Sequence, residues 1–292
     1  MKILIFGWDI GFRPSHKVDY LGDTVYHGLK EIYGKDVSSN IAQDHMYKDY
    51  KYLDRLRGHG FTLFGTLDPK LRVVDEDFES KIKEHYYDYI IFSRVHRSLE
   101  HYELVSKYYK GSEIVFVDGG DLKSLQPHNA NNPYFKRELW IDERKNLFSL
   151  GFGIPKSKFC KKKPKKTKKM AHQILPLGAG GSYKFKDEKE YYKDYQTSYY
   201  APTSQRNGFE CLRYLEIIAN RCLPIIPKLH EIPKNVMKYY PKDLLRFNQD
   251  MSEEEYDELV DKVFKHAYKN LTTEAMVKRM MKQLVEFNEI SK

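Results

Sequence analysis

The sequence predicts an α/β fold built on a doubly wound parallel sheet. Three short apolar runs, KILIF, YIIF and EIVFV, each end in a polar or glycine-containing loop, which is typical of buried parallel strands. Segments with helical periodicity lie between and after these runs, and this alternation favours helices on both faces of one sheet. With 292 residues, 41% of them hydrophobic, the chain is long enough for two lobes. The predicted strands are Lys2–Phe6, Tyr89–Phe92 and Glu113–Val117.

The first helix is predicted over Asp19–Tyr33, and Gly34 marks its end. Its apolar residues recur three or four positions apart, so they form one stripe that can face a core. Asp19, at the first position, fits an N-cap that accepts hydrogen bonds from the first turn. A further helix is expected over Leu99–Tyr109. The stripe consists of Leu21, Val25, Leu29 and Ile32.

A lysine-rich run over residues 156–169, KSKFCKKKPKKTKK, marks the predicted boundary between the two lobes. Removing its nine lysines from the 50 basic residues leaves 41, which equals the number of acidic residues, so this run accounts for the net charge of +9. We interpret the run as a linker or exposed loop, and attraction of an anionic surface, polymer or phosphate is the alternative. The expected division is an N-terminal lobe over 1–155, a C-terminal lobe over 170–250 and helices over 251–292.

The C-terminal part repeats the order of strand, loop and helix. A strand over His172–Leu177 is expected to run into a glycine cluster, and Leu223–Ile226 reads as another buried strand. Ser252 and Glu255 have the spacing of a capping box at the start of a helix. A last helix is predicted to begin at Thr273.

Cysteine usage and hydropathy exclude several protein classes. Three cysteines without paired spacing predict neither a disulfide framework nor a zinc motif. No segment has the roughly 18 apolar residues of a transmembrane helix, and the N-terminus turns polar too early for a signal peptide. We therefore expect a cytoplasmic protein, or one of the host cytoplasm if the chain is viral. The cysteines are Cys160, Cys211 and Cys222.

Neither a metal nor a cofactor is expected from the sequence. The eleven histidines show no HExxH or paired-ligand spacing, and the acidic triplet Asp75–Asp77 is interpreted as a solvated loop. Because the charge balance outside the lysine run is neutral, specific binding of nucleic acid is not expected either.

The strongest candidate for a binding site is the segment Ser204–Pro227, SQRNGFECLRYLEIIANRCLPIIP. A polar entry containing Arg206 precedes a predicted helix, whose free N–H groups and dipole favour an anion. Arg213 and Glu216 lie three positions apart and therefore share a helix face. An arginine can bind a diphosphate in bidentate fashion, and a carboxylate can accept hydrogen bonds from ribose hydroxyls. The alternative for this pair is an ordinary surface ion pair.

A second candidate is the glycine cluster GAGGSYK. Backbone N–H groups of Gly180 and Gly181 could approach a phosphate at the end of the preceding strand. The cluster lacks the Gly-Lys-Ser/Thr ending of a Walker loop, and a flexible turn is the alternative.

A proton acceptor is sought among the side chains that follow predicted strands, because ligands of open α/β sheets bind at the carboxyl ends of the strands. Asp19 is the first candidate and Asp121 the second, with His16 beside them. The alternatives are helix capping for Asp19 and a turn beside glycines for Asp121. Arg137, in YFKREL, could extend toward a phosphate or remain a surface charge, and His96 is interpreted as structural.

The string SQRNGFECLRYLEIIANRCLPIIP resembles the donor-site signature of exostosin-like glycosyltransferases and of related bacterial and chlorovirus-type sugar transferases. Matching by position, Arg213 takes the place of the phosphate-facing arginine, and Glu216 that of the nucleoside-binding glutamate. Cys211 departs from the pattern, in which a serine usually lies two positions before the arginine. Weaker resemblance is scattered over DYLGDTVYHGLKEIYG, GHGFTLFGTL, YFKREL, LGFGIP and NVMKYYPKDLL.

This resemblance implies a GT-B fold, in which two Rossmann-like lobes enclose a deep cleft. It also implies metal-independent, inverting transfer of a sugar from a nucleotide-diphosphate donor, with UDP-xylose preferred, to a hydroxyl of an oligosaccharide acceptor. Two other functions stay open at this point. One is a non-catalytic protein that binds an anionic polymer through the lysine run. The other is a different Rossmann-type enzyme, which is disfavoured because GWDIGF is not a GxGxxG fingerprint.

Overall fold

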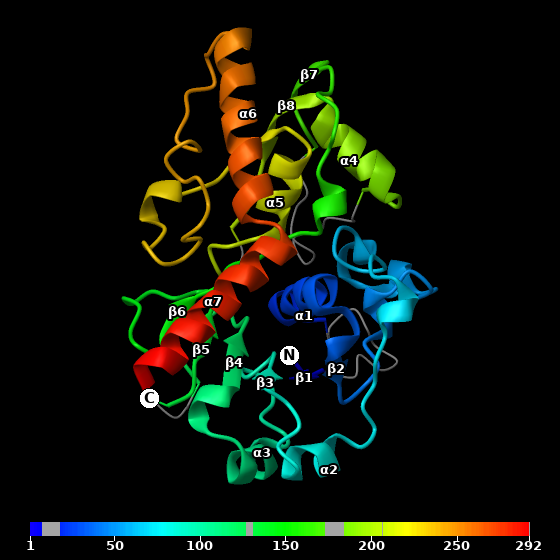
Figure 1. The fold of residues 1–292 in the computed structure, drawn as a ribbon. Coiled ribbons are helices and arrows are strands. Elements are labelled where there is room, and N and C mark those ends of the chain that lie inside the picture. The colour runs from blue at the N-terminus through cyan, green and yellow to red at the C-terminus, as the bar shows by residue number, and fades with distance from the viewer. Residues whose placement is uncertain (8–17, 127–130, 173–183, 206, 292) are drawn as a thin grey trace.

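The computed structural model describes residues 1–7, 18–126, 131–172, 184–205 and 207–291, and the side chains up to residue 289 (Figure 1). Within these residues, the larger sheet has six strands in the order β2-β1-β3-β4-β5-β6, and every neighbouring pair is parallel. The carboxyl ends of all six strands therefore lie at one edge. The strands are β1 (Ile3–Phe6), β2 (Val37–Ser39), β3 (Tyr89–Phe92), β4 (Ile114–Asp118), β5 (Tyr134–Lys136) and β6 (Leu147–Ser149).

Helices cover both faces of the larger sheet. Alternate side chains of β1 point to opposite faces, so Ile3 and Ile5 join one apolar cluster and Leu4 and Phe6 join the other. Helices α1 and α7 lie on the first face, and α2 and α3 on the second (Figure 1). Their bounds are α1 (Tyr20–Tyr33), α2 (Phe78–Lys83), α3 (Tyr102–Tyr108) and α7 (Thr273–Ser291).

A smaller parallel sheet of three strands, in the order β7-β8-β9, lies beside the larger one (Figure 1). Helix α4 packs on β8, and α5 packs between β9 and α6. The strands are β7 (Lys168–Met170), β8 (Ser198–Pro202) and β9 (Leu223–Ile225), and the helices are α4 (Glu188–Gln196), α5 (Leu212–Ala219) and α6 (Glu253–Asn270).

Short 3-10 turns connect the regular elements. They are η2 (Gly34–Asp36), η3 (Asp44–Met46), η4 (Leu53–Arg55), η5 (Arg57–Gly60), η6 (Pro69–Leu71), η7 (Gly111–Glu113), η8 (Lys156–Lys158) and η9 (Leu229–Glu231).

The predicted α/β class is confirmed, as are the strands at the three apolar runs. The side chain of Asp19 accepts hydrogen bonds from the N–H groups of Leu21 and Gly22, as expected of an N-cap. The capping box of Ser252 and Glu255 is also present. For two segments the expectation is either changed or falls on residues that are not described. The lysine run, expected to be a linker or loop, ends in strand β7, which pairs with β8. The strand expected over His172–Leu177 falls almost entirely outside the described residues.

Helix α7 returns to the first helix of the chain. Gly28 of α1 allows the two backbones to approach, since a Cβ there would lie 2.4 Å from the carbonyl oxygen of Thr273. His27 Nδ1 lies 2.9 Å from Thr273 Oγ1, and the Thr273 N–H donates to the carbonyl of Ile154 at 3.0 Å. The longest helices, α6 and α7, carry charges along their length. No helix in the described part of the chain is long and apolar enough to cross a membrane.

Replacement of Gly28 by alanine is predicted to destabilise the fold by about 1–3 kcal/mol, because the added methyl would overlap Thr273 and Val277 of α7. Chemical denaturation monitored by circular dichroism measures the change. Glu31→Ala, at an exposed position of the same helix, is the matched control and should change the free energy of unfolding by less than about 0.5 kcal/mol. Equal stability of the two variants would contradict close α1–α7 packing.

Candidate functional site

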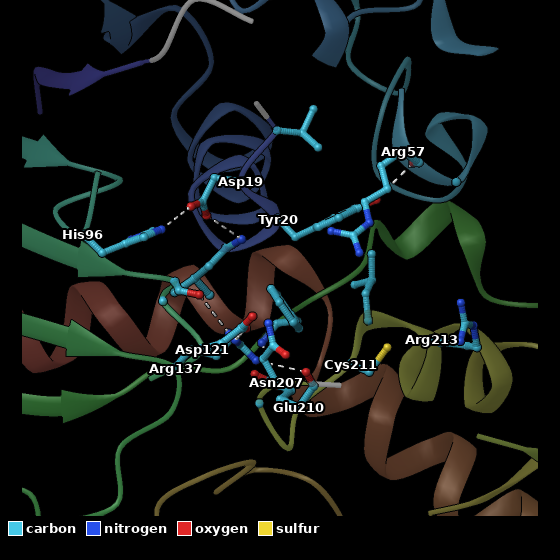
Figure 2. Close-up of a pocket in the computed structure, with 18 of the residues that line it drawn as sticks. Asp19, Tyr20, Arg57, His96, Asp121, Arg137, Asn207, Glu210, Cys211 and Arg213 are labelled. Carbon is cyan, nitrogen blue, oxygen red and sulfur yellow. Dashed lines mark hydrogen bonds and ion pairs between the residues drawn. The ribbon is translucent and has the colours of Figure 1, made fainter. Parts of the chain in front are cut away.

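The candidate site is a pocket of about 410 Å³ at the carboxyl edge of the larger sheet (Figure 2). Segments that follow five of its strands line one side, which is where open parallel sheets bind ligands. The facing side consists of residues 207–216, which include the first turns of α5. The residues that follow β1, β3, β4, β5 and β6 are, in that order, Asp19, His96, Asp121, Arg137 and Phe152.

Asp19 and His96 form a pair at one end of the pocket. His96 Nε2 lies 3.0 Å from Asp19 Oδ2, and its Nδ1 lies 3.4 Å from Asp118 Oδ1 on the other side of the ring. Burial by itself would raise the pKa of Asp19. The hydrogen bond from His96 and the charge of Arg94 outweigh burial and hold this pKa well below its usual range. Asp19 is therefore a carboxylate that stays ionised and orients His96.

Arg137 is the centre of a buried charge cluster that joins the two sides of the pocket. Its Nη1 donates to Glu138 Oε1 at 2.8 Å and to the carbonyl oxygen of Glu210 at 3.0 Å, while Nε donates to the carbonyl of Gly119 at 3.2 Å. Its Nη2 contacts Asp121. Burial opposes its charge, but the carboxylates of Glu138 and Glu210 outweigh burial and keep the Arg137 pKa above its usual value. The sequence left open whether Arg137 was a surface charge; it is 2% exposed.

The segment before α5 packs directly onto this cluster. The Glu210 N–H donates to Glu138 Oε1 at 3.0 Å, and the Glu210 carbonyl accepts from Arg137, so this segment is bound to both residues. Gly208 makes this approach possible, because a Cβ there would lie 2.5 Å from Glu138 Oε1. The polar, glycine-containing segment before α5 therefore packs against the buried carboxylate of Glu138 in addition to forming a turn.

Glu210 is a pocket residue that the sequence analysis did not select. It is 5% exposed, and its Oε1 accepts a hydrogen bond from the Phe152 N–H at 2.9 Å. Burial raises the pKa of this carboxyl to about 7, because the nearby Arg137 charge only partly compensates the lost hydration. A carboxyl group that titrates near neutrality can accept or donate a proton under physiological conditions.

Arg213 and Glu216 both line the pocket from α5, and both are buried rather than forming a surface pair. Glu216 Oε1 accepts from Thr62 Oγ1 and Oε2 accepts from the Tyr191 hydroxyl, each at 2.5 Å. A carboxylate oxygen can accept two hydrogen bonds, and within the described residues each of these oxygens accepts one from a side chain. Burial raises the pKa of Glu216, although these two hydrogen bonds oppose the rise.

Thr62 lies in a segment between β2 and β3 and bonds to residues of α4 and α5. Its backbone has an unusual conformation. Its φ of 76° lies in the left-handed region, which a β-branched residue adopts only under strain. Besides its bond to Glu216, its N–H donates to Glu188 Oε1 at 2.5 Å, and its Oγ1 lies 2.6 Å from the Tyr192 hydroxyl. Strained residues of this kind cluster at functional sites. In the sequence, the glycine-rich string GHGFTLFG around Thr62 was the feature that could have pointed to it.

The structure brings five of the predicted site residues together in this one pocket: Asp19, Asp121, Arg137, Arg213 and Glu216. Four others, His16, Arg206, Gly180 and Gly181, lie outside the described residues. The pocket also contains the exposed Arg57 and the buried Glu210, which were not predicted from the sequence, and His96, which was interpreted as structural. Arg57 belongs to the same glycine-rich segment as Thr62.

The pocket places cations and carboxylates on the same walls, which suits a ligand that has both anionic and hydroxyl groups. Arg57, Arg137 and Arg213 supply the positive charge, and the start of α5 adds its dipole. Within the described residues, no group of three or more His, Cys, Asp or Glu side chains is arranged to hold a metal ion.

A scan of the sequence against protein-family models and a search of curated proteins find no match.

Glu210 is predicted to make stability depend on pH between about 4.5 and 7. In this window the folded chain keeps a proton that the unfolded chain has lost, so the free energy of unfolding falls as pH rises. The change attributable to this group is on the order of 3 kcal/mol. Denaturation midpoints of Glu210→Gln and wild type at pH 5 and pH 8 measure it, because the difference between them should shift in favour of the variant at pH 8.

Glu254→Gln, at an exposed position of α6, is the control and should follow the wild-type pH profile. Parallel profiles for wild type and Glu210→Gln would show that the Glu210 carboxyl is ionised throughout this range in the folded protein.

Proposed function

We propose that the chain is a glycosyltransferase of the GT-B type, which moves a sugar from a nucleotide-diphosphate donor to a hydroxyl of an oligosaccharide. The observation that carries the proposal is the pocket itself. Five segments at the carboxyl edge of a parallel sheet face the start of α5, where Arg213 and Glu216 lie at the positions that the resemblance assigns to a donor. In this proposal the two sheets are the cores of the two lobes, and the pocket is the cleft between them.

The donor diphosphate is assigned to the cationic side of the pocket. Arg213 and the exposed Arg57 supply full charges, and the N–H groups at the start of α5 supply a partial one. These positive groups can stabilise the leaving diphosphate without a metal ion. The ribose is assigned to Glu216, because each of its oxygens can accept a second hydrogen bond besides the one it accepts within the described residues. UDP-xylose is the first donor to test, and the cytoplasm is the setting we propose.

The proton acceptor is assigned to Glu210. When the acceptor hydroxyl oxygen attacks the anomeric carbon, the bond to the diphosphate breaks and the hydroxyl proton must leave. Asp19 is a weak acceptor for this proton because its pKa is held far below neutrality. The Asp121 carboxylate already contacts Arg137. Glu210 has a pKa of about 7 and lines the same pocket, so it is best matched to a reaction near neutral pH.

Donor binding is the direct test. Saturating UDP-sugar, at about 100 times its Kd, should raise the free energy of unfolding by about 2.7 kcal/mol, measured as a thermal shift. Glu216→Gln should weaken donor binding about tenfold or more, because the amide that replaces the carboxylate loses a charge-assisted hydrogen bond to ribose. Arg213→Ala should weaken it similarly.

Arg246→Ala, which removes an exposed arginine outside the pocket, is the matched control and should bind the donor as wild type does. If Glu216→Gln also binds like wild type, the assignment of the ribose to α5 is wrong. If a nicotinamide or methyl-donor cofactor stabilises the chain and nucleotide sugars do not, the protein is a different Rossmann-type enzyme.

Replacement of the proton acceptor should separate kcat from KM. Glu210→Gln is predicted to lower the kcat of donor turnover by about 10²–10⁴ and to leave the donor KM nearly unchanged, whereas Glu216→Gln should mainly raise KM. Release of the nucleotide diphosphate, with water or a glycan as acceptor, measures both. The wild-type rate should rise with pH through about 7 as Glu210 loses its proton. Wild-type kcat in Glu210→Gln with a large loss in Asp19→Asn would assign the role to Asp19.

A further inference from the structure

We propose that a second groove, between the lysine run and α4, binds an acidic polysaccharide. The groove encloses about 740 Å³ and shares no lining residue with the pocket at the carboxyl edge of the larger sheet. Residues 157–165 form one wall, and residues of α4 form the other. This binding does not depend on the proposed glycosyltransfer reaction.

The groove collects positive charge from two segments that are distant in sequence. Lys158 and Lys165 come from the lysine run, and Lys189 and Lys193 come from α4. On α4, the two lysines and Gln196 are spaced i, i+4 and i+7 and share one face, and Glu188, at the start of the helix, also lines the groove. Another acid of α4, Asp194, pairs with Lys168 and accepts a hydrogen bond from the N–H of His172.

Most of this charge is not neutralised inside the protein. Lys158 pairs with Glu188 at 2.6 Å. Within the described residues, by contrast, no carboxylate lies within ion-pair distance of Lys165, Lys189 or Lys193, and all three side chains are exposed. The neighbouring Lys161 and Lys162 are exposed as well. Exposed lysines without acidic partners create a local positive potential that attracts anions.

The backbone of the lysine run is held in place, so its lysines start from fixed points along the groove. The Lys166 ammonium points inward, where it donates to the carbonyl of Arg221 at 2.5 Å, and burial lowers its pKa to about 8. The Cys160 N–H donates to the carbonyl of Ala219 at 2.8 Å, and the run then continues into β7. A run fixed at both ends keeps the groove open and pre-organised for a ligand.

The shape and chemistry of the groove favour a polysaccharide over other anions. Its concavity admits a chain, whereas a flat bilayer would reach only the rim. Single-stranded nucleic acid binds on exposed aromatic rings, but the rings in the lining are a buried one, Phe159, and a half-buried one, Tyr192, whose hydroxyl bonds to Thr62. All its cations are lysines, which act as flexible point charges and suit sulfate or carboxylate groups spaced along a hydrated chain.

Binding of fluorescent dextran sulfate to the full chain, with neutral dextran of the same length as the comparison, tests the proposal. The triple variant Lys165→Gln, Lys189→Gln, Lys193→Gln should lose about tenfold in affinity, because three exposed ion pairs are removed. The matched control removes the same charge from the surfaces of α6 and α7. It is Lys262→Gln, Lys278→Gln, Lys282→Gln, and it should stay within about twofold of wild type.

Retention of wild-type affinity in the groove variant, or an equal loss in the control, would overturn the proposal, because net charge alone would then account for binding. Tighter binding to an anionic phospholipid vesicle or to a single-stranded oligonucleotide, lost in the same variant, would assign the groove to another class of partner and would also overturn it. Circular dichroism confirms that each variant is folded. None of the six lysines lies in the donor pocket, so failure here leaves the proposed glycosyltransferase function standing.

Discussion

The buried guanidinium of Arg137 is the interaction on which the site depends. It follows β5 of the larger sheet, yet it bonds the backbone of Glu210, which leads into α5 beside the smaller sheet. A charge at 2% exposure is tolerated only when its donors find partners, and here a neighbouring carboxylate and two carbonyls supply them. The two sides of the pocket are therefore fixed to each other by the same group that gives the pocket its charge. Without the Glu210 segment, this buried guanidinium would lose one of its carbonyl partners.

Much of the larger sheet could be predicted because its signals are local. Runs such as YIIF predict a strand from four consecutive residues. Asp19 and Ser252 indicate helix starts, because a helix cap involves only neighbouring residues. The three-residue strands β5 and β7 have no such signal. Strand β7 consists of Lys168–Met170, whose exposed side chains give no apolar pattern, and only pairing with β8 defines it.

The site was predictable to the extent that topology placed it. Asp19, Asp121 and Arg137 follow strands, and parallel strands bring their carboxyl ends to one edge. The properties of Glu210 and Thr62 could not be read from their neighbours. Burial next to Arg137 sets the pKa of Glu210, and contacts with residues more than 120 positions away hold Thr62 in its strained conformation. Thr62 also lies between the two cavities, because it bonds Glu216 of the pocket and Tyr192 of the groove.

The return of α7 to α1 governs how the chain can be made. Helix α1 has left the ribosome long before Thr273 is added, yet the surface around Gly28 packs against α7, which begins at Thr273. During synthesis this apolar surface stays exposed until a segment some 245 positions downstream has been made. The N-terminal part of the fold therefore cannot complete its packing until late in synthesis. A nascent chain stalled before residue 273 would therefore be a natural client for chaperones.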